Sequence, residues 1–249
     1  MATVKLIADS GATKAEWCLM KGKKKKIFFT TGISPYLMNS EQIIKMLNKE
    51  LKPALKKEVI SEIYYYGTGC GNPENVKSIR KALKEVFPTS KKINVDTDIM
   101  AAARAVCGKK KGIACILGTG SNACFFSGSR ITKSSPGLGY VLGDEGSGAY
   151  LGRKVIQHFL YNTFDRAQDA LAEKKNIFEN KFKTNRVEIL DRIYRQPLPN
   201  KYMASFALFL SENRGHYMIE NIIEDSFNDF FFNHIYKFKE SWLYPVNFV

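Results

Sequence analysis

Two short turns built from glycine, threonine, serine and alanine have the composition of phosphate-binding loops. Residues 9–14 read DSGATK and residues 118–122 read GTGSN. A bound phosphate requires backbone N–H groups that approach one point closely, together with a hydroxyl or a cation, and these residue types supply them. Neither turn fits the P-loop pattern or a GxGxxG that opens a helix. A plain hairpin turn also explains either one taken alone.

Acidic residues stand at two further points of the chain. Residues 96–98 read DTD and join a short strand to an alanine-rich helix at 100–106. Asp144 and Glu145 lie in a glycine-dense loop that leads directly into another helix. Carboxylates in such a loop can bind sugar hydroxyls or organise a metal–nucleotide complex. Helix capping by Asp144 or Ser147 explains the same loop in purely structural terms.

The strands and helices predicted around these residues form two similar halves. Residues 4–8 and 16–20 predict a hairpin around the first turn, and residues 113–117 and 123–127 predict one around the second. We expect the boundary between the halves at 108–112. The other predicted elements are a strand at 60–66 and helices at 40–51 with Ser40 as N-cap, 73–86, 148–159, 186–195, 201–211 and 219–238.

The composition is that of an ordinary globular protein, with 45% apolar, 12% aromatic and 25% charged residues among 249. The 38 Lys and Arg exceed the 24 Asp and Glu, and the resulting charge of +14 favours phosphate-bearing partners. No segment approaches the roughly 20 consecutive apolar residues of a membrane span. The N-terminus begins a strand instead of a cleavable signal, so we expect a cytoplasmic protein with no membrane contact.

The cysteines argue against a metal centre. They form an odd set without a CxxC pair, and the three histidines are scattered. Zinc, an iron–sulfur cluster and a disulfide framework are therefore disfavoured. We expect small buried thiols at Cys18, Cys70, Cys107, Cys115 and Cys124.

The order of the motifs resembles one known family. DSGATK, VDTDIMAAARA, ILGTGSN and GLGYVLGDEGSGAYLGR follow one another within residues 4–160. The same order is found in the N-acetylglucosamine kinase branch of the actin-like sugar kinase ATPases, a group that also contains the benzoyl-CoA reductase activator-type ATPases. The resemblance implies an α/β fold with two ribonuclease-H-like lobes, each a mixed five-stranded sheet flanked by helices. We expect these lobes at 1–107 and 108–249, the second with a helical insertion.

The same resemblance implies a reaction, ATP-dependent phosphorylation of an amino sugar, with N-acetylglucosamine converted to its 6-phosphate and Mg²⁺ as the metal. Asp98 is expected as the catalytic base, in preference to Asp96, because the acid of the family directly precedes the start of the small-residue helix. Asp9 is expected to hold the metal through water, and Thr13 to face the β- and γ-phosphates. The expected phosphate loops are Asp9, Ser10, Gly11, Ala12, Thr13 and Lys14, and Gly118, Thr119, Gly120 and Ser121. The expected sugar-binding residues are Asn122, Gly139, Tyr140, Asp144 and Glu145.

The sequence departs from the family in two places. The kinases carry a sugar-contacting asparagine after the first hairpin, whereas residues 32–36 here read GISPY, which leaves the identity of the sugar open. The family also continues beyond a segment like residues 245–249 into an adenosine loop and a final helix. We therefore expect that the last segment of the second lobe is missing from the sequence.

Two other functions are compatible with parts of the sequence. An ATPase that activates a partner enzyme would have the same fold without phosphorylating a sugar. A nucleic-acid binder would suit the charge and the lysines at 23–26 and 109–111, but no helix-turn-helix or RNP pattern accompanies them. We therefore expect a small sugar as partner and no nucleic acid. The aromatic residues at 227–232 predict a buried helix face, with a homodimer contact as the alternative.

Overall fold

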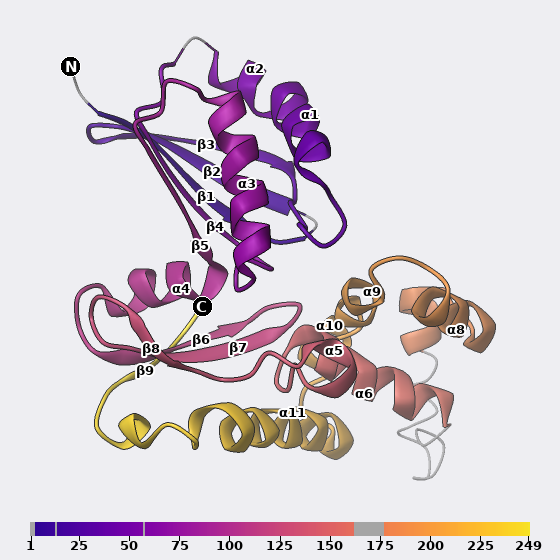
Figure 1. Cartoon of the computed structure of the whole chain (residues 1–249). Helices are drawn as coiled ribbons and strands as arrows, with labels where there is room; N and C mark the ends of the chain where they lie inside the picture. Colours follow the sequence, from indigo (N-terminus) through magenta and orange to yellow (C-terminus); the bar gives the residue numbers. More distant parts are fainter. Residues whose placement is uncertain (1–2, 13, 57, 162–176) are drawn as a thin grey trace. The chain divides into compact units, whose positions relative to one another are not determined.

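The structure is a computed structural model that describes residues 3–12, 14–56, 58–161 and 177–249. It contains two compact units, Met1–Ala105 and Val106–Val249, each with its own sheet and apolar core (Figure 1). We refer to them as the N-terminal unit and the C-terminal unit. Among the described residues, no helix combines the length and hydropathy that a bilayer crossing requires.

The sheet of the N-terminal unit has the strand order β3-β2-β1-β4-β5. β1, β2 and β3 form an antiparallel meander, and β4 and β5 run parallel to β1, so the sheet is mixed as predicted. The hairpin expected around residues 9–14 is therefore confirmed. The strands are β1 Val4–Ser10, β2 Lys14–Lys21, β3 Lys24–Thr31, β4 Glu62–Gly67 and β5 Lys92–Thr97.

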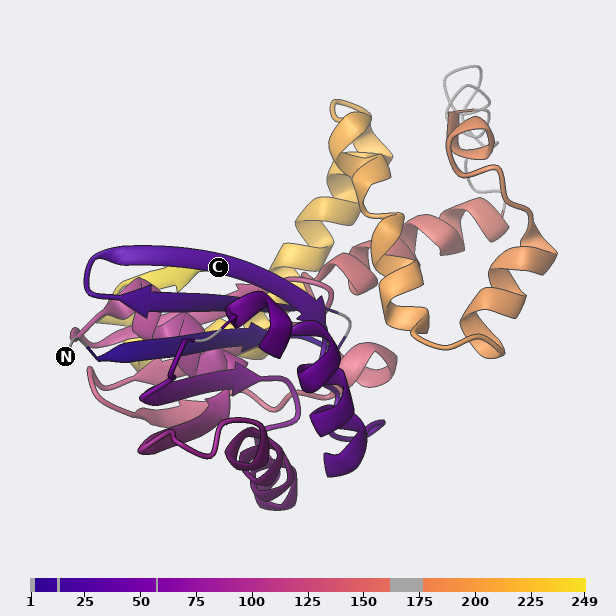
Figure 2. The same ribbon diagram turned by 90° about the horizontal axis from the view of Figure 1, so that it is seen from above.

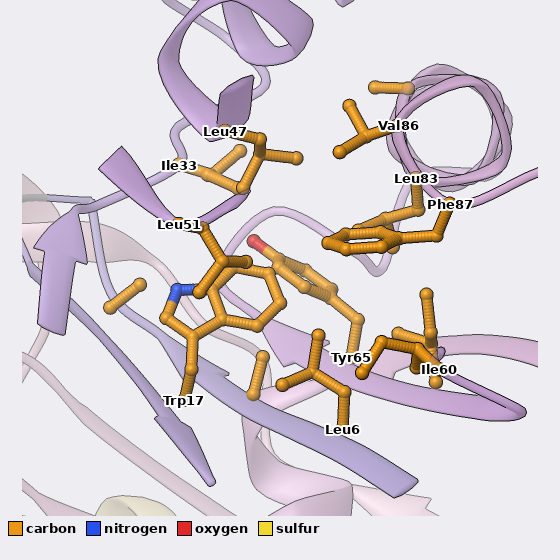
Figure 3. Close-up of a cluster of buried hydrophobic side chains, with 14 of the residues drawn as sticks. Leu6, Trp17, Ile33, Leu47, Leu51, Ile60, Tyr65, Leu83, Val86 and Phe87 are labelled. Carbon is orange, nitrogen blue, oxygen red and sulfur yellow. The ribbon is translucent and has the colours of Figure 1, made fainter. Parts of the chain in front are cut away.

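The core of this unit lies between the sheet and its helices (Figure 3). Alternate residues of β1 are buried, because successive side chains of a strand point to opposite faces. Trp17 is fully buried, and its indole N–H donates to the Thr30 hydroxyl at 2.9 Å. Leu47 and Leu83, from two different helices, belong to the same buried cluster, and each such side chain contributes about 1.5–3 kcal/mol of apolar burial.

The predicted helices of the N-terminal unit are present, with one difference at a cap and one additional short helix at 52–55. Asn39, not Ser40, caps the first helix, since the Asn39 side chain accepts from Gln42 N and the Gln42 side chain accepts from Asn39 N. The Ser40 hydroxyl instead lies 2.8 Å from that of Ser78 on the third helix. The helices are α1 Ser40–Glu50, α2 Lys52–Leu55, α3 Pro73–Val86 and α4 Asp98–Cys107, which contains the boundary between the units.

The sheet of the C-terminal unit repeats the plan of the first. β6, β7 and β8 form an antiparallel meander, and β9 runs parallel to β6 in the position that β4 has beside β1. The order is β8-β7-β6-β9, so the described residues form four strands where five were expected. The chain between β8 and β9 is mainly helical and adds no further strand within the described residues. The strands are β6 Gly112–Leu117, β7 Ser121–Phe126, β8 Ile131–Ser134 and β9 Val246–Phe248.

The helices of this unit form a separate apolar cluster beside the sheet, and α11 joins this cluster to the sheet (Figures 1 and 2). The predicted helix at 201–211 is in fact two helices, because Phe206 N and Phe209 N bond three residues back and tighten the backbone there. The helices are α5 Gly139–Leu142, α6 Gly148–Leu160, residues 177–182, α8 Arg186–Tyr194, α9 Pro199–Ser205, α10 Leu208–Glu212 and α11 Tyr217–Phe230, followed by the π-helix η2 Phe231–Ile235 and the 3₁₀-helix η3 Lys239–Trp242.

The buried face predicted at residues 227–232 is wrong for most of its members. Phe230 is buried, but Phe227, Phe231 and Phe232 are 45%, 41% and 58% exposed. Phe230, Phe231 and Phe232 are consecutive, and consecutive residues of a helix point about 100° apart, so these three rings cannot share one face. The change from α-helix to π-helix after Phe230 also shifts the later side chains around the axis.

Candidate active site

The first predicted phosphate loop is held in place by Ser10. The Ser10 side chain is fully buried, and its hydroxyl accepts from Ile33 N at 3.2 Å and donates to Gly11 O at 3.3 Å. Gly11 N donates to Lys14 O at 3.0 Å and closes the turn. Gly11 and Ala12 therefore form a short exposed turn at the end of β1. Thr13 lies outside the described residues.

Lys14 begins β2 and makes a contact that its expected role does not require. Its ammonium group lies over the ring of Phe29 on β3, 4.1 Å from the centroid. Such a cation–π contact contributes about 0.5–1 kcal/mol at an exposed site. A phosphate near the loop would compete with this contact for the lysine side chain.

Two predicted acids lie at the same edge of the first sheet. β1, β4 and β5 are parallel neighbours, so Asp9 pairs with Tyr66 and Tyr66 pairs with Asp96, and Asp98 follows β5 as the first residue of α4. Partial burial raises the pKa of the Asp9 carboxyl, and the negative charges of Asp98 and Glu16 raise it further. The structure therefore brings the Asp9 and Asp98 carboxyl groups within electrostatic range of each other.

Asp98 has the electrostatics of a poised base. Burial raises the pKa of its carboxyl, and a hydrogen bond from Ile99 N to Asp98 Oδ1, 2.8 Å long, partly opposes the shift. Asp96 is also half-buried, and its carboxylate accepts from Thr97 N at 2.9 Å. A desolvated carboxylate binds a proton more readily, which favours acceptance of a proton from a hydroxyl nucleophile.

Two residues near this edge were not anticipated from the sequence. Tyr66, between Asp9 and Asp96 in the sheet, accepts a hydrogen bond at its hydroxyl from the Arg104 guanidinium of α4. The guanidinium carbon also lies 5.6 Å from the Tyr66 ring centroid. Asp9, Tyr66 and Asp96 are paired across β1, β4 and β5. Arg104 therefore brings a positive charge to Tyr66, the residue between the two acids. The motif VDTDIMAAARA contains Arg104, but its partner becomes apparent only in the structure.

The second predicted phosphate loop is attached to the start of α6. Gly118 N donates to Gly120 O at 3.0 Å and closes the turn between β6 and β7. Gly148 N then donates to Gly118 O at 2.8 Å, and Ala149 N donates to Thr119 O at 3.1 Å. The first N–H groups of a helix lack partners within the helix, and here the turn supplies them. The turn is therefore fixed by the helix that follows the Asp144 loop.

Asp144 lies directly against this second turn. A Cβ at Gly120 would be 2.9 Å from Asp144 Oδ2, so a larger residue there would require the carboxylate to shift. Ser121 N donates to Asp144 Oδ1 at 3.4 Å. The φ of Asp144 is +59°, a left-handed conformation that is uncommon outside glycine. Burial raises the pKa of the Asp144 carboxyl, whereas the hydrogen bond from Ser121 N and the positive charge of Arg153 oppose this shift.

Glu145 points into a different set of contacts. Its Oε2 lies 2.9 Å from His234 Nε2, and its Oε1 accepts from Asn233 Nδ2 at 3.3 Å. His234 Nδ1 lies 2.5 Å from the hydroxyl of Ser135. None of these three partners was expected, because no spacing in the sequence connects them. Of the two caps predicted for α6, Asp144 and Ser147, the structure shows Ser147, whose hydroxyl accepts from Tyr150 N at 3.1 Å.

The other expected sugar-binding residues lie in the same unit. Gly139 and Tyr140 begin α5, and the Arg153 guanidinium of α6 donates to Tyr140 O at 2.9 Å. Asn122 is half-buried on β7, and its side-chain oxygen accepts from Ala123 N at 2.8 Å. Arg153 was not predicted, although it ends the motif GLGYVLGDEGSGAYLGR.

Comparison with known proteins places the chain in a family. No family model matches it. A crystal structure from Porphyromonas gingivalis, described as a "putative N-acetylglucosamine kinase", is 35% identical and superposes with a TM-score of 0.90 over 98% of this chain and 84% of that one. The chain belongs to the actin-like sugar kinases.

Two further proteins are similar to this chain at lower identity. The N-acetylmuramic acid/N-acetylglucosamine kinase of Clostridium acetobutylicum is 24% identical over 216 residues, which are 83% of this chain and 70% of that protein. A structure from Chromobacterium violaceum, also described as a "putative N-acetylglucosamine kinase", is 16% identical with a TM-score of 0.71, over 100% of this chain and 87% of that one. The latter supports the fold alone. The predicted fold class and family are thereby confirmed.

A sugar kinase of this family uses ATP, and the acids of the first sheet are suited to the accompanying metal. Mg²⁺ is usually held by one or two carboxylates together with waters and substrate phosphates. The repulsion between Asp9 and Asp98 is a charge arrangement that a divalent cation would relieve. Within the described residues, no three His, Cys, Asp or Glu side chains converge as a self-sufficient metal site. The cysteines there are free, with Cys18 half-buried and Cys70, Cys107, Cys115 and Cys124 buried.

Proposed function

We propose that this kinase transfers the γ-phosphoryl group of ATP to the 6-hydroxyl of an amino sugar, with N-acetylglucosamine as the first candidate. The observation that carries the proposal is the half-buried Asp98 carboxylate, whose pKa is raised, at the sheet edge that also holds Asp9 and the first glycine turn. The 35% identity to the Porphyromonas gingivalis protein supports the choice of sugar.

In the proposed reaction, Asp98 accepts the proton of the sugar 6-hydroxyl while the oxygen of that hydroxyl attacks the γ-phosphorus of ATP. A new O–P bond forms, the bond to the β–γ bridging oxygen breaks, and ADP leaves. Phosphoryl transfer depends mainly on positioning and charge stabilisation. The protein therefore needs only one carboxylate as base, within hydrogen-bond reach of the attacking hydroxyl. Bound Mg²⁺ would neutralise charge on the phosphates, and Asp9 is the residue proposed to hold it through water.

The remaining roles are assigned by position in the family motifs. Residues 9–14 and 118–121 are proposed to bind the phosphates through backbone N–H groups and hydroxyls. The residues proposed to hold the sugar are Asn122, Gly139, Tyr140, Asp144 and Glu145. We further propose that the two units correspond to the lobes expected at 1–107 and 108–249, and that the enzyme acts in the cytoplasm. The contact of Asp144 with Gly120 and Ser121 also makes this carboxylate a candidate neighbour of the phosphates.

A coupled ADP-release assay tests the proposed function. The purified protein is incubated with ATP and Mg²⁺, alone or with N-acetylglucosamine, N-acetylmuramic acid, glucosamine, N-acetylmannosamine or glucose, and the product is located by NMR. We expect ADP release that requires an N-acetylated amino sugar, with N-acetylglucosamine 6-phosphate as product. The Asp98→Asn variant is the matched control. Hydrolysis that is independent of sugar would instead indicate an ATPase that activates a partner enzyme.

We also propose that the chain forms a homodimer. The exposed rings of Phe227, Phe231 and Phe232 form an apolar surface on α11 and η2, and aromatic residues are enriched in protein interfaces. Light scattering coupled to size-exclusion chromatography measures the mass in solution. A mass of 28.2 kDa at all concentrations would contradict the proposal.

A further inference from the structure

Three polar side chains from distant parts of the C-terminal unit form a continuous hydrogen-bonded chain. Ser135 follows β8, His234 lies in η2, and Glu145 lies between α5 and α6. His234 Nδ1 is 2.5 Å from Ser135 Oγ, and His234 Nε2 is 2.9 Å from Glu145 Oε2. Ser135 and His234 are 6% and 4% exposed, and the Glu145 side chain is 15% exposed. Buried polar groups require partners, and each nitrogen of this imidazole has one.

The backbone around His234 departs from the regular α-helix and sets the direction of the imidazole ring. The regular α-helical pattern of α11 ends at Phe230, and Phe231–Ile235 is a π-helix. π-helical turns are rare and are frequent at functional sites, because the wider turn changes the direction of the side chains. The Phe230 ring stacks on the imidazole with centroids 4.9 Å apart and planes at 23°. His234 is therefore fixed from the side by an apolar ring and at both nitrogens by polar partners.

The contact with Glu145 restrains the neighbouring Asp144. Glu145 Oε1 also accepts from Asn233 Nδ2 at 3.3 Å, so both carboxylate oxygens are held by adjacent residues of η2. Asp144 has a left-handed backbone and places its carboxylate against Gly120. A non-glycine residue in this conformation persists only where its surroundings hold it. We call the contacts of Asn233 and His234 with the Glu145 carboxylate the clamp. The clamp holds the residue that directly follows Asp144 and so restrains the Asp144 backbone.

We propose that His234 is a positioning residue, which holds Glu145 and through it sets the Asp144 carboxylate at the second turn. Ser135 completes the arrangement by fixing the orientation of the imidazole. When the ring is neutral, the Ser135 hydroxyl donates to Nδ1 and Nε2–H donates to Glu145. The inference rests on the proposed function only in that the acids at 144 and 145 bind substrate. Ser135 is too buried to serve as a nucleophile itself.

Two substitutions at one position separate this role from a merely structural one. The amide of His234→Gln reaches as far as Nε2 and can still donate to Glu145. The shorter amide of His234→Asn reaches only as far as Nδ1, so it keeps the Ser135 contact and loses Glu145. Both variants lose the ring and its stacking on Phe230. They are therefore matched in packing loss and differ in the contact that the proposal requires.

We expect His234→Asn to raise, by about tenfold, the same Michaelis constant that Asp144→Ala raises, as is typical when an outer partner of a site ligand is lost. His234→Gln should retain most of the wild-type value. Melting temperatures of the two variants should be lowered to a similar extent. Equal kinetic effects in both variants, or equal rises of the sugar and ATP KM values in His234→Asn, would overturn the proposal.

NMR of the imidazole nitrogens tests the contact without any assay of turnover. The chain has three histidines, so the His234 signals can be assigned by comparison with the His234→Gln spectrum. We expect Glu145→Gln to shift the Nε2 signal and Ser135→Ala to shift Nδ1. Unchanged nitrogen signals in Glu145→Gln would overturn the proposed clamp. If both variants shift these signals as expected but the protein phosphorylates no sugar, the clamp is supported and the proposed function is refuted.

Discussion

At the scale of single residues, three carboxylates share one physical property. Burial raises the pKa values of Asp9, Asp98 and Asp144, so the folded protein holds their protons more tightly than the unfolded chain does. Groups of this kind lower stability at neutral pH, where they are ionised. Perturbed acids clustered beside glycine turns are typical of active sites, which trade stability for function.

Asp98→Asn tests whether the proposed base contributes to turnover while lowering stability at neutral pH. We expect the turnover rate to fall by about 10²–10⁴-fold, the usual contribution of a general base, while ATP affinity is retained. Because the folded pKa of Asp98 is above 3.8, stability is lost as pH rises through the folded pKa, and removing the charge restores it at neutral pH. The melting temperature should therefore rise by roughly 2–4 °C.

Turnover and thermal denaturation at neutral pH are the measurements for this variant. Asp96→Asn is the matched control, since it alters the neighbouring acid of the same motif and should keep most of the activity. Near-normal turnover of Asp98→Asn would reject it as the base. A lower melting temperature at neutral pH would contradict the burial argument.

Asp144→Ala tests which substrate this carboxylate serves. We expect a larger rise in the KM of the sugar than in that of ATP, because the motif position assigns Asp144 to sugar hydroxyls. Loss of a hydrogen bond to a charged group corresponds to about tenfold or more in affinity. Initial-rate kinetics with each substrate varied in turn give both constants. The reverse order would place Asp144 at the phosphates, next to Gly120.

At the scale of secondary-structure elements, local signals were sufficient wherever turn chemistry decided the outcome. The hairpins around residues 9–14 and 118–122 and the helix Pro73–Val86 follow the prediction, because alternation, small-residue turns and the Asn72 cap act within a few residues. The split of 201–211 and the π-helix after Phe230 did not follow from local signals. Both depend on how these helices pack against their neighbours.

The packing of α6 on α9 gives a prediction at this scale. A Cβ at Gly152 would be 1.8 Å from Met203 O, so the two helices touch through backbone atoms. Gly152→Ala must separate them, and we expect a loss of at least about 2 kcal/mol in the free energy of unfolding. Gly137→Ala is the control, because no heavy atom lies within 4 Å of its added Cβ. Urea denaturation measures both, and equal stabilities would contradict the close contact.

At the scale of the whole molecule, the excess of 14 positive charges distinguishes the two substrates. ATP is highly charged and N-acetylglucosamine is neutral, so of these two substrates only ATP should be attracted by the general field. Screening shortens from about 30 Å at 0.01 M to about 8 Å at 0.15 M salt. We expect the KM of ATP to rise severalfold over this range and the KM of N-acetylglucosamine to stay constant. A parallel rise of both constants would contradict the electrostatic explanation.

The sequence by itself determined the fold class, the family and the repeated strand–turn–strand plan. These depend on motif order and on local rules, such as glycine in turns and alternating burial in strands. The sequence also indicated the acids of the candidate site. Their individual roles remain proposals, since a residue type in a motif position specifies neither its neighbours nor its burial.

The tertiary structure alone decided which side chains meet. The Asp144 carboxylate contacts Ser121, 23 positions away, and His234 joins Glu145 and Ser135 across 89 and 99 positions. It also decided that Trp17 is buried, whereas Trp242 is 73% exposed. Such contacts have no local signal, because they result from the packing of whole helices and sheets and not from the preferences of neighbouring residues.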